Sequence, residues 1–134
     1  MSAPGRHSWF GTTVLIGVLY SVIGIVFALP SSQVRVWRLA AWVVSAALFA
    51  AHIGYEHFRR GNSPPVTALH TALAVAVGAF GLAVAANVHE VWVASSYRRS
   101  LALALVAWPV LTGLPAFVVA LVTAYGLALT RRRG

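Results

Sequence analysis

The chain has 134 residues, of which 60% are hydrophobic and 9% are charged, whereas soluble domains carry roughly 25% charged residues. This composition excludes a soluble globular protein, and the absence of cysteine excludes disulfides, thiolate metal sites and redox-active thiols. The net charge of +8 comes from arginines that flank apolar segments, a pattern typical of contact with lipid headgroups and not of nucleic-acid binding.

Four apolar segments are close to the length that crosses a bilayer: 9–29, 36–58, 66–88 and 101–129. The separators are short and carry nearly all the charge. We therefore predict one domain, 1–134, that is an all-α integral membrane protein, with four transmembrane helices in a compact antiparallel bundle.

The arginines also bear on orientation. Six of them lie on the side of the two termini (6, 59, 60 and 131–133) and four lie on the other side (35, 38, 98 and 99). Because positive residues are retained on the cytoplasmic side, this bias favours cytoplasmic termini. The bias is small, so an inverted dimer with both orientations is the alternative. The absence of lysine beside many arginines is typical of a GC-rich bacterial genome, and we expect a multi-pass protein of the bacterial inner membrane.

The first segment has one broad face of small residues, at a spacing that lets helix backbones approach closely in lipid. We interpret this face as a packing seam that ends before a tight turn at Pro30. The residues of the face are Thr13, Gly17, Ser21 and Gly24.

The second segment carries a polar stripe. Arg38, Ser45, His52 and Arg59 recur at every seventh position, and Glu56 follows His52 by one helical turn. At about 100° per residue these side chains share one face. Polar and ionisable groups at membrane depth are costly, so they usually face a bundle interior, a water-filled path or an ion.

Three members of the stripe have an ordinary structural interpretation. Arg38 and Arg59 can extend to the headgroups, and the Ser45 hydroxyl can bond to a backbone carbonyl one turn earlier. His52 and Glu56 leave two readings open: a structural pair that locks two helices, or part of a functional site.

The residues after the second segment predict a compact turn. Gly61 and Asn62 suit a helix C-terminus, and Ser63 followed by Pro64 suits the start of the next helix. The second and third segments should therefore form an antiparallel hairpin.

This hairpin predicts the depth of the histidines. His52 and His70 are equally distant from Gly61 in sequence, so they should lie at similar depth on neighbouring helices. We therefore expect His52, Glu56 and His70 to converge about two turns below one surface. His57 should lie on another face, nearer the headgroups. Small residues continue the face of His70: Ala74, Gly78, Gly81 and Ala85.

Three kinds of chemistry suit this group of residues. His52, Glu56 and His70 could bind zinc or another divalent metal, two histidines could ligate a b-type haem, or the group could pass protons, since histidine titrates near neutral pH. The helical zinc-protease pattern His-Glu-x-x-His is absent, and the sequence leaves the cofactor, if any, unknown.

A second polar group ends the third segment. His89 and Glu90 lie close in sequence to Arg98 across a short loop. We interpret them as an interfacial ion-pair cluster, with Glu90 as a second gate of a transport path in the alternative.

The fourth segment contains Pro109 and Pro115, with Thr112 between them. Each proline removes a donor and frees the carbonyl four residues earlier. This stretch is therefore a candidate hinge, either kinked or locally unwound, of the kind that lines sites in some transporters. The alternative is an ordinary proline bend in a membrane helix.

No sequence feature indicates an enzyme, because a phosphate-binding loop, a Ser/His/Asp arrangement and paired carboxylates are all missing. Small-residue faces on the first and third segments favour assembly into a homo-oligomer in the lipid bilayer. We predict a small homo-oligomeric channel or transporter that moves an ion or protons along a His/Glu-lined path. The alternatives are a haem- or metal-binding protein of electron transfer and a structural subunit of a membrane complex.

Overall fold

A computed structural model describes the backbone of residues 8–93 and 98–131 and the side chains of residues 8–89 and 103–131. It contains the helices α1 (Ser8–Ala28), α2 (Val34–Gly54), α3 (Pro64–Val93) and α4 (Arg98–Arg131). The chain continues from α2 into a five-residue π-helix, η1 (Tyr55–Arg59). Four stretches of these helices are long and apolar enough to cross a membrane. The predicted all-α fold with four membrane spans is therefore confirmed.

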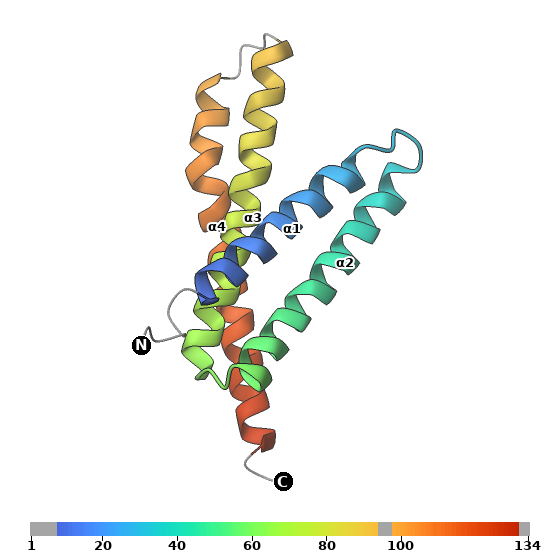
Figure 1. Cartoon of the computed structure of the whole chain (residues 1–134). Helices are drawn as coiled ribbons and strands as arrows, with labels where there is room; N and C mark the ends of the chain where they lie inside the picture. The colour runs from blue at the N-terminus through green and yellow to red at the C-terminus, as the bar shows by residue number, and fades with distance from the viewer. Residues whose placement is uncertain (1–7, 94–97, 132–134) are drawn as a thin grey trace.

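The four helices form two hairpins that meet at one end (Figure 1). The start of α1, the η1 turn and the end of α4 lie toward this end, while α1 and α2 lean away from α3 and α4 toward the other. α3 is the central helix, since it packs along both α1 and α4, whereas α2 makes little contact with α3. The two approach each other near η1 (Figure 1). The junction of the hairpins therefore brings the end of α2 against the start of α3.

Glycines allow α1 and α3 to cross closely. A Cβ atom on Gly17 would lie 2.5 Å from Val77 Cγ1, and one on Gly78 would lie 2.5 Å from Tyr20 Cβ. The Ser21 hydroxyl donates a hydrogen bond to the Gly78 carbonyl at 3.0 Å. The packing seam predicted for the first segment is thus confirmed, and its partner is the small-residue face of α3.

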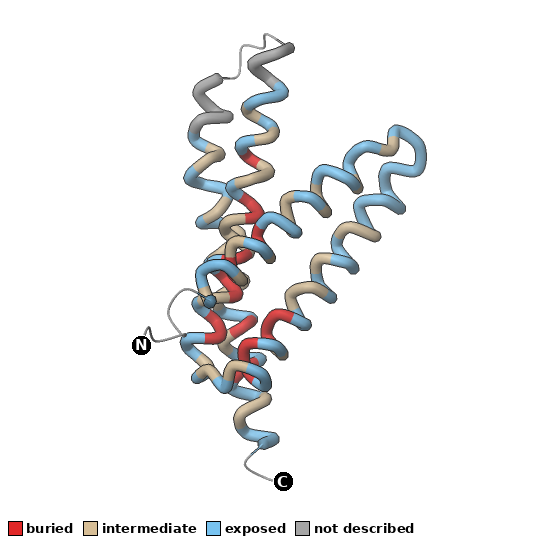
Figure 2. The backbone as a smooth tube through the Cα atoms, viewed as in Figure 1, coloured by how far each residue is buried: buried red, intermediate tan, exposed pale blue. Residues whose placement is uncertain are grey.

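The buried apolar positions are occupied mostly by alanine, because the helices approach too closely for larger side chains. Figure 2 shows the buried positions along α3 and at its junction with η1. Large apolar side chains point outward instead, as Trp42, Leu103 and Val106 do. An apolar exterior of this kind suits contact with lipid chains. The buried apolar residues are Ile53, Ala68, Ala72, Ala74, Ala79, Ala83, Ala120 and Ala124.

The turn between α2 and α3 follows the sequence prediction. Gly61 adopts the left-handed conformation with φ of 63°, which glycine tolerates without steric cost. The backbone N–H of Thr67 donates to the Ser63 carbonyl at 2.9 Å, and Pro64 is the first residue of α3. The predicted compact connection is confirmed.

Of the two states predicted for the fourth segment, kinked or locally unwound, the unwound one is wrong. α4 is continuous from Arg98 to Arg131, with Pro109 and Pro115 inside the helix. Thr112 Oγ1 donates to the Trp108 carbonyl at 2.8 Å and approaches the Pro109 carbonyl at 3.3 Å. The carbonyls that the two prolines leave without a backbone donor are those of Leu105 and Leu111, so this hydroxyl does not replace the lost bonds. The helix nevertheless continues through both prolines. The role of this stretch as a hinge stays a prediction.

Candidate functional site

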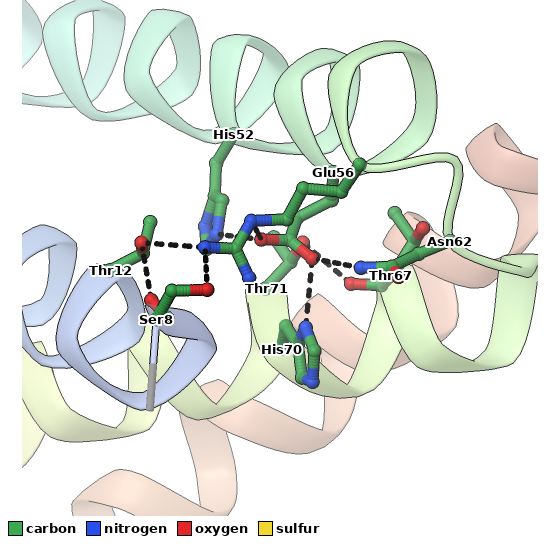
Figure 3. A network of polar contacts seen from close by, with 9 residues as sticks. Ser8, Thr12, His52, Glu56, Asn62, Thr67, His70 and Thr71 are labelled. Carbon is green, nitrogen blue, oxygen red and sulfur yellow. Dashed lines mark hydrogen bonds and ion pairs between the residues drawn. The ribbon is translucent and has the colours of Figure 1, made fainter. Parts of the chain in front are cut away.

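The Glu56 side chain is fully buried, and its carboxylate is surrounded by polar groups from two helices and the turn between them. Its Oε2 atom lies 2.8 Å from His70 Nδ1 and accepts a hydrogen bond from the Asn62 amide. Its Oε1 atom lies 3.5 Å from Arg60 Nε and 3.8 Å from His52 Nε2 (Figure 3). We call these five residues the Glu56 cluster.

Arg60 ties the cluster to α1. Its Nη2 atom donates hydrogen bonds to Ser8 Oγ at 3.2 Å and to Thr12 Oγ1 at 3.1 Å, and Figure 3 shows both hydroxyls beside the cluster. The guanidinium also lies 5.6 Å from the centre of the Tyr55 ring, within the range of a cation–π interaction. The Arg60 guanidinium, whose positive charge compensates Glu56, is therefore held by the carboxylate, by two hydroxyls of α1 and by the Tyr55 ring.

His70 is held between two groups. One face of its ring stacks on Trp9, with ring centres 4.9 Å apart and planes 6° apart, while its Nδ1 atom engages Glu56. The His70 side chain keeps 12% of its surface exposed, whereas that of Glu56 keeps none. His70 thus connects the buried carboxylate with the exterior of the protein.

The π-helix decides which side chains turn inward. The Arg60 N–H donates to the Tyr55 carbonyl five residues earlier, so residues five apart come close to the same face. His57 follows His52 by five residues and is buried, with 5% of its surface exposed. The π turn therefore turns His57 into the bundle, whereas its predicted place near the headgroups stays a prediction. Single π turns are frequent at functional sites.

Several buried polar atoms near the cluster have no hydrogen-bond partner among the described residues. These atoms are Glu56 Oε1, Thr67 Oγ1 and both ring nitrogens of His52 and of His57. An unsatisfied buried polar group costs about 1–3 kcal/mol. Hydrogen bonding in the cluster is therefore incomplete. Glu56 Oε2 has two partners, whereas Glu56 Oε1 and the His52 imidazole lie opposite each other without a hydrogen bond.

The remaining members of the predicted stripe lie away from the cluster. Arg38 and Arg59 are exposed, as expected for side chains that extend to headgroups. Ser45 is half-buried and lines a cleft that does not include the Glu56 cluster. Its predicted bond to a backbone carbonyl is not formed with any described residue.

Thus the structure brings together His52, Glu56 and His70 and adds partners that the sequence analysis missed. Arg60 stands four residues after Glu56, a spacing that signals an ion pair on a helix. Asn62 and Trp9 carried no such signal, because a turn and a separate helix bring them to the site.

The geometry does not fit a metal or haem. Among the described residues, no three or more histidine, cysteine, aspartate or glutamate side chains form a group that could hold a metal ion. The two histidines approach opposite oxygens of one carboxylate, and Arg60 adds a positive charge beside them. A b-type haem needs open space between its axial ligands, whereas the Glu56 carboxylate lies between His52 and His70 (Figure 3).

The predicted interfacial cluster lies at the other end of α3. His89 is exposed, and the side chains of Glu90 and Arg98 lie outside the described residues. Its role as an ion-pair cluster or a gate therefore stays a prediction.

No protein-family model, curated protein or solved structure matches this chain.

Proposed function

We propose that this multi-pass membrane protein is a small channel or transporter that carries protons through the Glu56 cluster. The observation that supports this most is the 3.8 Å approach of His52 Nε2 to Glu56 Oε1, two buried atoms that have no hydrogen-bond partner in the part of the chain that the structure describes. A small movement would close this gap into a hydrogen bond. A proton could then pass between the imidazole and the carboxylate.

The charges of the cluster favour protons over other ions. Glu56 and Arg60 form an ion pair and compensate each other's charge, and the imidazoles of His52 and His70 can each accept and release one proton. The Arg60 guanidinium, 3.5 Å from the carboxylate, would repel a metal cation at the same place. A proton needs no coordination shell and can be held by one imidazole at a time.

The exposure of the cluster gives the proton an exit. His70 bonds to Glu56 Oε2 and is partly exposed, as is the Arg60 side chain, at 12% and 17%. On the other side, His52 continues the α2 stripe toward Ser45 and the cleft between the hairpins. We propose that protons pass between the cleft and the surface near Trp9 by way of His52, Glu56 and His70.

The test is proton flux into proteoliposomes that contain a pH-sensitive dye, driven by a potassium diffusion potential. We expect Glu56→Gln and His52→Gln each to slow the flux by about a hundredfold, the scale on which loss of a positioned proton carrier slows transfer. Arg59→Gln changes an exposed side chain outside the cluster and should leave the flux at the wild-type rate.

Circular dichroism and gel filtration of each variant separate a lost carrier from a lost fold. Wild-type liposomes with no more flux than empty ones would overturn the proposal and favour a structural subunit. Undiminished flux in a folded Glu56→Gln protein would also overturn it, because the carboxylate would then carry nothing.

A further inference from the structure

Trp9 and His70 form a stacked pair at one side of the Glu56 cluster. Their ring centres lie 4.9 Å apart and their planes differ by 6°, so the indole lies flat against one face of the imidazole. Trp9 is the second residue of α1 and is half-buried, and tryptophan at the end of a span suits the interfacial region of a bilayer. The stacked pair therefore lies on the side of the cluster that faces the membrane surface.

The residues around Trp9 fix its position. Ser8 and Thr12 each accept a hydrogen bond from Arg60 Nη2, at 3.2 and 3.1 Å, and the Arg60 guanidinium is ion-paired with Glu56. The first turn of α1 is thus bonded to the same cluster as His70. Because Trp9 belongs to this turn, the helix and not stacking alone holds its ring beside His70.

The partner of His70 Nδ1 determines which nitrogen carries the hydrogen in the neutral ring. An ionised carboxylate only accepts hydrogen bonds, and Glu56 is paired with Arg60. The 2.8 Å contact between Glu56 Oε2 and His70 Nδ1 therefore places the hydrogen on Nδ1. The Nε2 atom then keeps its lone pair. It lies on the far side of the ring from Glu56 (Figure 3), and no described residue forms a hydrogen bond with it.

Trp9 limits which edge of the His70 ring can meet the carboxylate. With the ring plane fixed by stacking, only the Nδ1 edge or the Cδ2 edge can turn toward Glu56 Oε2, and of these only Nδ1 donates a hydrogen bond. A ring that was free to tilt could offer Nε2 instead.

We propose that Trp9 is a positioning residue, which holds His70 in the Nδ1–H tautomer and leaves Nε2 as a proton acceptor on the side of the membrane surface. The role of Nε2 in uptake, and only that role, rests on the proposed function. There Nε2 takes a proton from a hydronium ion, which leaves as water, and the ring becomes an imidazolium. The indole face beside it favours this cation.

The test is NMR spectroscopy of the full chain in detergent, with ¹⁵N-labelled histidine, at a mildly alkaline pH where histidine is neutral. Correlations between the ring nitrogens and the carbon-bound ring protons show which nitrogen carries the hydrogen, and His70→Gln assigns the signal. We expect Nδ1–H for His70 in the wild type. In Trp9→Leu the ratio of Nδ1–H to Nε2–H should fall about fivefold, equivalent to about 1 kcal/mol of ring stacking. Trp9→Phe retains a flat ring and should retain Nδ1–H.

Trp42→Leu is the matched control, because it makes the same change at an exposed tryptophan of α2, and it should leave the His70 ratio unchanged. Circular dichroism checks the fold of each variant. Wild-type His70 with its hydrogen on Nε2, or a folded Trp9→Leu protein with the wild-type ratio, would overturn the proposal. An equal shift in Trp42→Leu would overturn it too, since stacking would not be the cause. The spectra involve no transport, so Nδ1–H on His70 in a protein without proton flux would overturn the proposed function and support this assignment.

Discussion

Charge compensation governs the chemistry at the scale of single residues. Glu56 is fully buried, yet its carboxylate is ion-paired with Arg60 and bonded to His70. An ionised carboxylate in an apolar interior is stable only when it is paired and hydrogen-bonded. The partners of Glu56 thus explain how one acidic residue persists inside a membrane-spanning bundle.

The two adjacent arginines make this argument testable. Arg60→Gln removes the cation beside a buried carboxylate and the contacts with Ser8 and Thr12, so the free energy of unfolding should fall by about 3 kcal/mol. Arg59→Gln makes the same change at an exposed side chain and should have little effect. Unfolding by sodium dodecyl sulfate in mixed micelles, followed by circular dichroism, measures both. Equal effects of the two changes would contradict the assignment of Arg60 as the partner of Glu56.

At the scale of elements, the π turn and the turn that follows it determine the register of the cluster. η1 turns His57 inward, and Gly61 then reverses the chain so that Asn62 reaches Glu56. The Asn62 N–H also bonds to the Glu56 carbonyl at 3.2 Å. Asn62 thus forms hydrogen bonds with both the backbone and the side chain of Glu56.

Gly61 is therefore a sensitive position. Gly61→Ala places a Cβ atom at φ of 63°, where an L-residue is strained by about 1–2 kcal/mol, so the variant should unfold at lower detergent denaturant concentration. Gly54→Ala is the matched control: Gly54 has φ of −58° and open space around it, and alanine there should raise stability by up to about 1 kcal/mol. A stabilising effect of Gly61→Ala would contradict the left-handed turn.

The crossing of α1 and α3 is the second element-scale feature. Gly78→Ala would drive a methyl group to 2.5 Å from Tyr20 Cβ and 3.1 Å from the Gly17 carbonyl, and overpacking of this kind costs about 1–3 kcal/mol. Gly126→Ala, on α4, meets no atom within 4 Å and should be neutral or slightly stabilising. The same unfolding experiment compares them, and a Gly78→Ala protein as stable as Gly126→Ala would refute the close crossing.

The whole molecule is organised by the meeting of its two hairpins at one end. The Glu56 cluster lies at that junction and contains groups from α2, η1 and α3, with Arg60 bonded to α1. Away from the junction the two hairpins diverge (Figure 1). Protonation at the junction would therefore act on the contact that holds the hairpins together.

Orientation is a property of the whole chain that cysteine labelling can test. The chain has no cysteine, so Ser32→Cys and Ser63→Cys each introduce one thiol, in the turns at opposite ends of the bundle. With cytoplasmic termini, as the arginines predict, a membrane-impermeant maleimide should label Ser32→Cys in intact bacterial cells and Ser63→Cys only after disruption of the cells. Labelling of both variants in intact cells would contradict a single orientation and favour dual insertion.

The sequence by itself determined the four spans, the turn at Gly61–Pro64 and the convergence of His52 with Glu56 and His70. These features depend on hydrophobic length, local backbone preference and helical periodicity, which are all local in the chain. The depth of His70 followed from the same arithmetic, because a short turn between antiparallel helices fixes equal rise on both sides.

Only the tertiary structure decided the rest of the site and its surroundings. The π turn that buries His57, the stacking of Trp9 on His70 and the bonds from Arg60 to Ser8 and Thr12 depend on how separate helices pack. The continuity of α4 through Pro109 and Pro115 also could not be read from proline preference alone. The physical reason is that periodicity assigns side chains only to the faces of a regular helix. Contacts between helices determine which faces meet and where a regular α-helix is interrupted by a π turn.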